Sequence, residues 1–220
     1  MPAHEMPSDL RAVYEALRTE VTWLHARWIS YTQLFGKSPK RIDLLNECAR
    51  SLFYFVHETL ANDLLLSLCK LTDPATQGKN ENLSLHQLQQ KLDSVGEPSL
   101  AAGCKTVLAT LDGHAEPLKT LRNKQLAHLD LAVALNKATE PLPPVSRQEI
   151  NEALALVRQY LNAIEIYYND NEWGYEHFLM TGSDGDALVH VLSNGLRYHE
   201  LVLEEVIEYD DFQKGAWNDA

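Results

Sequence analysis

One stretch of the chain, residues 117–130, places an arginine, an amide and a histidine among regularly spaced leucines. These three residues are Arg122, Asn123 and His128. A guanidinium group stays charged at physiological pH, and its planar fork can bind two phosphate oxygens. An imidazole exchanges protons near neutral pH, because its unperturbed pKa is about 6.5. These residue types therefore predict a site that binds phosphate and transfers protons without a metal ion.

The same residues also fit a less specific interpretation. Lys119 and Lys124 flank Arg122, so the basic side chains would form a solvated helix face. His128 would then only cap the helix, since a protonated histidine is favoured at the negative pole of the helix dipole. The sequence alone leaves this alternative open.

Leucines at helical spacing predict that a helix over residues 116–135 carries these side chains. On a straight α-helix, Arg122 and His128 would point about 120° apart, so one helix does not bring them to one spot. Two arrangements would solve this problem. Either the helix breaks near Ala127, or two copies of it meet across a two-fold axis.

Apolar residues at steps of three and four predict helices along most of the chain. The expected helices span residues 8–34, 39–72, 84–94, 100–111, 116–135, 147–168 and 184–192. Asp112-Gly113-His114 fits either a break between two of these helices or a bend through which one helix continues. Residues 75–83 are expected to form a polar loop, and the proline-containing residues 138–145 a stiff linker. Asn194-Gly195 fits either a helix end or the tip of a hairpin over residues 188–201, and we prefer the helix.

This pattern predicts an all-α fold, an up-and-down bundle of long antiparallel helices. The helix over residues 39–72 is expected to be central and covered on several sides, because Phe53 and Phe55 widen its apolar stripe. Asp63 interrupts that stripe, and a charge is rarely buried without a partner. We expect Asp63 either to hold Arg122 or His128 in place or to lie on an exposed edge.

The net charge is unevenly distributed. Residues 170–220 contribute −10 of the total of −12, so that residues 1–169 carry −2. We therefore expect a helical-bundle domain over residues 1–170 and an acidic, partly helical appendage over residues 171–220 that packs on it. A nearly neutral bundle excludes a protein that coats nucleic acid in general, but it allows a recessed, locally positive site.

The remaining composition argues against several other classes of protein. Cys48, Cys69 and Cys104 lie far apart, which argues against disulfides or a zinc site and favours reduced thiols in a cytoplasmic protein. No signal peptide and no apolar run of about 18 residues is present, so no membrane segment is expected. No metal-ligand spacing or phosphate-binding glycine loop appears, and we expect no metal or cofactor.

The stretch containing Arg122-Asn123 and His128 resembles the motif of the HEPN superfamily, in which an arginine and a histidine four to six residues apart form an RNA-cleaving site. The helix that precedes it ends in Leu-Cys-Lys-Leu-Thr-Asp-Pro, residues 68–74. This ending resembles the abortive-infection-U branch of the superfamily. The resemblance covers residues 10–170.

The resemblance implies an HEPN-like bundle that forms a homodimer with the site at its interface. It implies a metal-independent endoribonuclease that leaves 2′,3′-cyclic phosphate and 5′-hydroxyl ends, in a toxin–antitoxin or phage-defence setting. Its partners would be RNA and an antitoxin or other regulatory protein. The residues implied in the site are Arg122, His128 and Asn123 as catalytic groups, and Asp63, Lys119 and Lys124 as supporting groups. The alternative is a catalytically inactive HEPN-like dimer that binds nucleotides or a protein.

Overall fold

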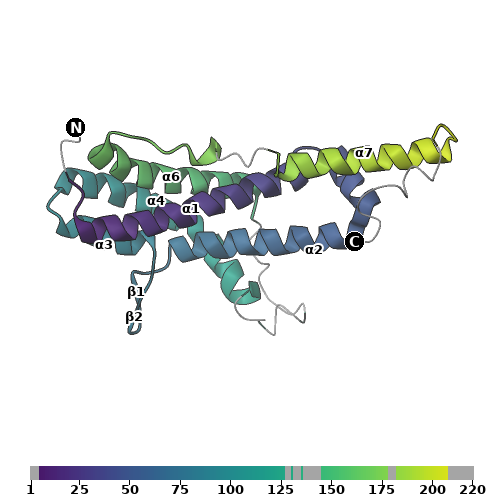
Figure 1. Ribbon diagram of the computed structural model, residues 1–220. Helices are drawn as coiled ribbons and strands as arrows, with labels where there is room; N and C mark the ends of the chain where they lie inside the picture. The colour runs from purple at the N-terminus through teal and green to yellow at the C-terminus, as the bar shows by residue number, and fades with distance from the viewer. Residues whose placement is uncertain (1–4, 127–129, 131–134, 136–144, 178–181, 208–220) are drawn as a thin grey trace. The chain divides into compact units, whose positions relative to one another are not determined.

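The protein is an all-α helical bundle, as the sequence predicts. The computed structural model describes residues 5–126, 130, 135, 145–177 and 182–207. Its α-helices are α1 (Ser8–Phe35), α2 (Pro39–Leu71), α3 (Leu85–Ser94), α4 (Pro98–Leu121), α6 (Arg147–Asn169) and α7 (Gly185–Leu203) (Figure 1). None of the helices in these residues combines the length and the apolar character needed to cross a bilayer.

Short elements connect some of the helices. A π-helical turn, η1 (Arg122–Leu126), follows α4, and a 3₁₀ turn, η2 (Tyr175–His177), follows α6. The predicted loop after α2 contains a small antiparallel hairpin of β1 (Thr76–Gln77) and β2 (Asn80–Glu81). Gly78 turns this hairpin with a φ of +64°, a conformation that a residue with a side chain rarely adopts.

The chain forms two compact units. Unit 1 comprises Met1–Trp28 and Leu60–Phe178, and unit 2 comprises Ile29–Thr59 and Leu179–Ala220. Helices α1 and α2 therefore contribute residues to both units. A bundle domain over residues 1–170 with an appendage over residues 171–220 stays a prediction, because compactness does not test which segment folds independently.

Helices α1 and α6 are antiparallel in unit 1. Near the start of α1, Tyr14 Oη donates a 2.6 Å hydrogen bond to Glu165 Oε2 near the end of α6. Further along α1, Trp28 Nε1 donates a 2.7 Å hydrogen bond to Asn151 Oδ1 near the start of α6. Residue numbers that rise along α1 therefore fall along α6.

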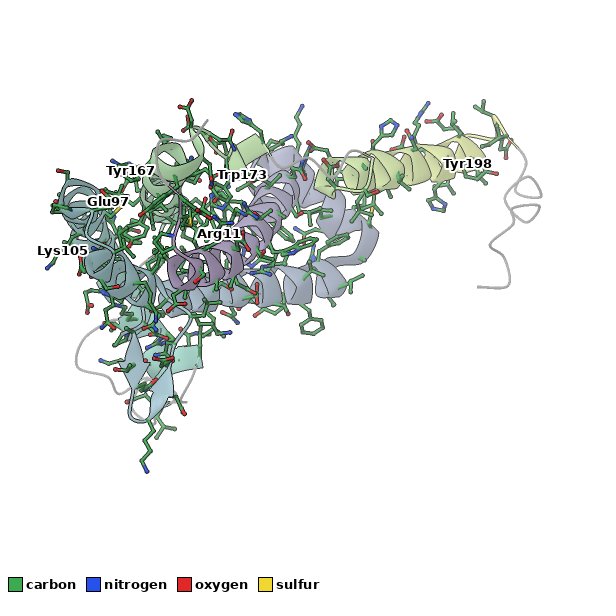
Figure 2. All side chains as sticks on the ribbon, turned by 60° about the vertical axis from the view of Figure 1, so that its left-hand side comes forward. Arg11, Glu97, Lys105, Tyr167, Trp173 and Tyr198 are labelled. Atoms are coloured by element: carbon green, nitrogen blue, oxygen red, sulfur yellow. The ribbon has the colours of Figure 1, made fainter. Side chains whose placement is uncertain are left out.

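Helix α4 packs against α6, also in antiparallel orientation. Glu97, just before α4, accepts a hydrogen bond from Tyr167 near the end of α6, and Figure 2 shows these two side chains together. At the other end, His114 Nδ1 lies 3.8 Å from Glu152 Oε2. Ser146 and Glu149 form the predicted capping box at the start of α6, with reciprocal bonds of 2.6 and 3.2 Å.

The core of unit 1 contains the apolar stripes that the sequence predicts. Completely or almost completely buried residues come from α1 (Leu10, Leu17, Val21 and Leu24) and from α6 (Leu154, Val157, Leu161 and Ile164). Burial of one such side chain contributes about 1.5–3 kcal/mol. These helices are stabilised mainly because each buries its apolar face against a neighbouring helix. Intrinsic helix propensity alone would not suffice.

Of the two alternatives for residues 112–114, a break or a continuous helix, the structure shows the continuous helix. A single helix, α4, continues through Asp112-Gly113-His114 and contains Pro117. Leu111, Ala115 and Leu118 are at most 2% exposed, so packing sustains the helix across residues that favour a break. The helix also does not reach residue 135, because Asp130 is not helical and Leu135 lies in a turn.

The expectation that α2 is covered on several sides is wrong for its part in unit 2. The helix is kinked at Ala49, where φ is −164° and ψ is 70°. Beyond the kink Phe53 is buried, but Leu52 and Phe55 are 58% and 64% exposed. The apolar residues that widen the stripe therefore lie partly in solvent.

Helix α7 belongs to unit 2 and continues through Asn194-Gly195 to Leu203, so the preference for a helix over a hairpin is confirmed, but the expected helix end at these residues is wrong. Asp184 caps it by accepting a 2.9 Å hydrogen bond from the Ala187 backbone. A Cβ atom on Gly185 would lie only 2.9 Å from Gln33 Cβ, so a glycine is needed at this contact with the end of α1.

His25 is a buried histidine in unit 1 whose contacts fit only its neutral form. The side chain is 2% exposed. Its Nε2 accepts a 3.2 Å hydrogen bond from Arg158, which can only donate, and its Nδ1 lies 2.8 Å from the Val21 carbonyl oxygen. Burial lowers the pKa of His25 to about 4.

We expect this histidine to make unit 1 less stable in acid. The unfolded chain binds a proton at an ordinary histidine pKa near 6.5, whereas the folded chain resists it down to about 4, so stability falls as the pH drops through that window. The loss at pH 4 should be about 3 kcal/mol. Urea unfolding between pH 7 and pH 4 measures it. His25→Gln should reduce the dependence of the free energy of unfolding on pH, and His114→Gln should leave that dependence as in the wild type. An unchanged pH dependence in His25→Gln would contradict the role of His25.

Candidate functional site

Arg122 stands at the junction between α4 and the π-helical turn η1. It caps α4 with helical backbone angles, φ −52° and ψ −52°. Lys119, three residues earlier, lies on the same side of α4 because residues three apart are neighbours on a helix surface. π-Helical turns within helices are rare and occur frequently at functional sites. The local geometry thus marks this helix end as unusual.

Two hydrogen bonds fix the Arg122 side chain. Its Nη1 donates to Asp73 Oδ1 at 2.8 Å, and its Nε donates to Asn123 Oδ1 at 3.1 Å. The hydrogen bond to Asp73 raises the pKa of Arg122 above its ordinary value. The arginine is 19% exposed and the aspartate 23%, so the pair is largely shielded. Among the residues that the structure describes, none accepts a hydrogen bond from its Nη2.

Asp63 does not hold Arg122, so that alternative is wrong, whereas a contact of Asp63 with His128 stays a prediction because His128 lies outside the described residues. Asp63 Oδ2 instead lies 2.8 Å from Arg27 Nε on α1. Asp63 lies eight residues before the end of α2 and its side chain is 45% exposed, whereas Arg122 bonds Asp73 just beyond that end. The residue that the sequence reasoning missed is Asp73, which directly follows the predicted helix end and precedes Pro74. An acidic residue at that helix end was the available signal.

The basic residues near Arg122 also have acidic neighbours. Lys119 Nζ lies 3.6 Å from Glu116 and 3.9 Å from Asp112. The structure therefore brings Arg122, Asn123 and Lys119 to one helix end, but their surroundings are mixed in charge rather than strongly positive.

His128 lies outside the described residues, so the described site geometry comprises Arg122 and its neighbours without His128. The rotation of about 120° applies to a straight α-helix. The helix changes its geometry at Arg122, before Ala127, because η1 has a π-helical pattern. The placement of His128 thus stays a prediction.

The described residues offer no alternative metal or thiol chemistry here. In this part of the chain no three His, Cys, Asp or Glu side chains are grouped so that they could hold a metal ion. Cys69, close to Arg122 and Asp73, is buried, and burial raises its pKa to about 11. It is therefore a neutral packing residue and not a nucleophile.

The all-α helical bundle is consistent with a HEPN domain. The chain matches the AbiU2 family of HEPN domains over residues 7–187 and belongs to that family. It is thus an abortive-infection-related HEPN domain. The match begins just before α1, includes every candidate residue named above, and ends in the first turn of α7. Comparisons with curated proteins and with solved structures gave no match.

The Arg122–Asp73 pair should be energetically coupled, because both side chains are largely shielded and directly bonded. A double-mutant cycle with Arg122→Gln and Asp73→Asn should give a coupling of about 1 kcal/mol in the free energy of unfolding. Arg197 and Glu200 provide a matched control, since they also lie 2.8 Å apart but are more than half exposed, at 56% and 57%. That pair should show no measurable coupling. Equal values in both cycles would mean that Asp73 does not hold the arginine.

Proposed function

We propose that this AbiU2-family chain is a metal-independent endoribonuclease whose reaction site contains Arg122, Asn123 and His128. The observation that carries the proposal is the fixed guanidinium at the end of α4, held by Asp73 and Asn123 with its Nη2 donors left over. A preorganised cation stabilises the charge that develops on a phosphoryl group, and it does so without reorganisation during the reaction.

The proposed reaction uses a nucleophile that RNA supplies itself. The 2′-hydroxyl oxygen attacks the adjacent phosphorus, the bond from phosphorus to the 5′-oxygen breaks, and a 2′,3′-cyclic phosphate and a 5′-hydroxyl result. Arg122 binds the non-bridging oxygens. His128 exchanges a proton with the reacting oxygens, a role that suits the ordinary pKa of imidazole. Lys119 and Lys124 support binding of the phosphate backbone.

The proposal includes a homodimer in which two copies of the segment after α4 meet. A two-fold axis would place Arg122 of one chain beside His128 of the other, which a single straight helix does not achieve. The setting that fits an abortive-infection-related HEPN domain is phage defence or a toxin–antitoxin pair, with an antitoxin or other regulatory protein as a second partner.

Alanine substitutions should separate the chemistry from the fold. His128→Ala should lower the rate of RNA cleavage by about 10²–10⁴ through loss of proton transfer. Arg122→Ala should lower it by about 10²–10³ through loss of transition-state stabilisation. The measurement is cleavage of total cellular RNA with analysis of the new ends, with and without EDTA. Arg197→Ala, which removes an exposed arginine on α7, is the control and should cut at the wild-type rate.

The outcomes of this experiment discriminate between a metal-independent ribonuclease and an inactive binding module. Wild-type cutting in EDTA with 2′,3′-cyclic ends supports the proposal. Cutting that needs a divalent metal, or equal cutting by wild type and His128→Ala, contradicts it. RNA binding without any cutting favours the inactive nucleotide- or protein-binding module, for which the acidic neighbours of Arg122 and Lys119 are the supporting observation.

The dimer has its own test. Light scattering at micromolar concentration in native buffer should give a mass twice that of one chain. Mixing Arg122→Ala with His128→Ala should then restore part of the activity, because one of the two mixed sites in a heterodimer keeps both groups. A monomeric mass for an active enzyme would contradict the proposal that the site is formed at the interface of a homodimer.

A further inference from the structure

A groove of about 470 Å³ lies beside the Arg122–Asp73 pair in unit 1. It is lined by residues that follow α2 (Thr72, Pro74 and Ala75), by residues of α3 (His86, Gln89 and Gln90) and by residues of α4 (Asp112, Glu116 and Lys119). Thr72 and Pro74 flank Asp73, which binds Arg122. The segment that lines the groove on this side therefore also carries the partner of Arg122.

His86 and Asp112 face each other in this groove. His86 Nε2 lies 3.0 Å from Asp112 Oδ1, and each side chain is 33% exposed. A carboxylate only accepts, so the hydrogen bond places the imidazole proton on Nε2 and leaves the lone pair on Nδ1. Nδ1 has no hydrogen-bond partner among the residues that the structure describes. This is the arrangement of a base that a carboxylate orients and stabilises in its protonated form.

Lys119 joins this pair to the site around Arg122. Its Nζ lies 3.9 Å from the same Asp112 oxygen. On α4 the lysine lies one turn before Arg122. A phosphodiester bound by Arg122 and Lys119 would thus lie along the groove that His86 lines.

Cleavage through the 2′-hydroxyl requires two proton transfers. One group removes the 2′-hydroxyl proton, and another supplies a proton to the departing 5′-oxygen. The motif Arg122-Asn123-…-His128 provides one imidazole per chain. A second proton carrier close to the arginine would complete the requirement.

We propose that His86 is this second group, a general base that accepts the 2′-hydroxyl proton on Nδ1, with Asp112 as its positioning residue. The inference rests on the proposed ribonuclease function. The 2′-oxygen then attacks phosphorus, the bond to the 5′-oxygen breaks, and His128 gives its proton to that oxygen. No water is consumed, and the proton taken by His86 balances the one given by His128.

A purely structural role for His86 predicts different behaviour, and the chain contains a matched control. His114 also faces a carboxylate, Glu152, and is also 33% exposed, but it joins α4 to α6 and does not line the groove. Both histidines tie two helices of unit 1 together. Only His86 should matter for the chemistry.

The experiment compares wild type, His86→Gln and His114→Gln on total cellular RNA. Glutamine at position 86 can still donate to Asp112 but does not titrate. The rate of new-end formation should fall by about 10²–10⁴ in His86→Gln and stay unchanged in His114→Gln, with similar melting temperatures. His86→Gln should also lose the acidic limb of the pH–rate profile, because glutamine does not titrate.

Two further measurements keep the proposal testable if a variant is unstable. Free imidazole should restore part of the rate of His86→Ala, and it should do nothing for His114→Ala. Binding of a 2′-O-methyl RNA, which lacks the reacting hydroxyl, should be unchanged in His86→Gln. A wild-type rate and an intact acidic limb in His86→Gln would overturn the role of His86 while leaving the ribonuclease proposal in place. A wild type that cuts no RNA would overturn both.

Discussion

Unit 1 depends on the burial of α6 against α1 and α4. Val157, Leu161 and Ile164 have no exposed surface, so any polar group that enters this core needs a partner. Glu165 shows how the constraint is met. Burial alone would raise its pKa, but hydrogen bonds from Tyr14 and neighbouring asparagines outweigh burial and lower it. The carboxylate therefore stays charged inside the bundle and fixes the register of α1 on α6.

This rigid register gives the candidate site its geometry. Because α4 is packed along α6, its last turn is fixed, and with it the positions of Lys119 and Arg122. The end of α2 brings Asp73 to that turn, where it bonds Arg122 at 2.8 Å. Helix α3 adds His86 on the other side of the groove. Asp73 thus contacts the end of α4 and His86 contacts Asp112 further back along the same helix, although these residues are far apart in sequence.

The sequence predicts the parts of the fold that depend on local pattern. The apolar stepping of residues 147–168 and the Ser146–Glu149 capping box correctly predict α6, because burial of one face and the satisfaction of its first backbone donors are local properties. The partner of Arg122 depends on where two antiparallel helices end, which periodicity does not encode. The sequence therefore offers Asp63 as one candidate partner of Arg122, whereas the structure pairs Arg122 with Asp73 and Asp63 with Arg27. The continuity of α4 through residues 112–114 could not be decided from the sequence for a related reason, since packing of Leu111 and Ala115 outweighs the local preference for a break.

The pairing of Arg122 with Asp73 also bears on how an acidic protein would select RNA. An unpaired arginine on a flexible side chain loses conformational freedom when it binds, whereas Asp73 and Asn123 fix this one in advance. The same carboxylate removes part of the attraction that an isolated guanidinium would exert on any phosphate. Asp112 and Glu116 do the same for Lys119. In the proposed ribonuclease, general affinity for polyanions is thereby reduced, and a strand would gain most when it fills the groove and places its phosphate on the Nη2 donors of Arg122. Such a site favours selection by shape and position over electrostatic attraction, which fits residues 1–169 with a net charge of −2.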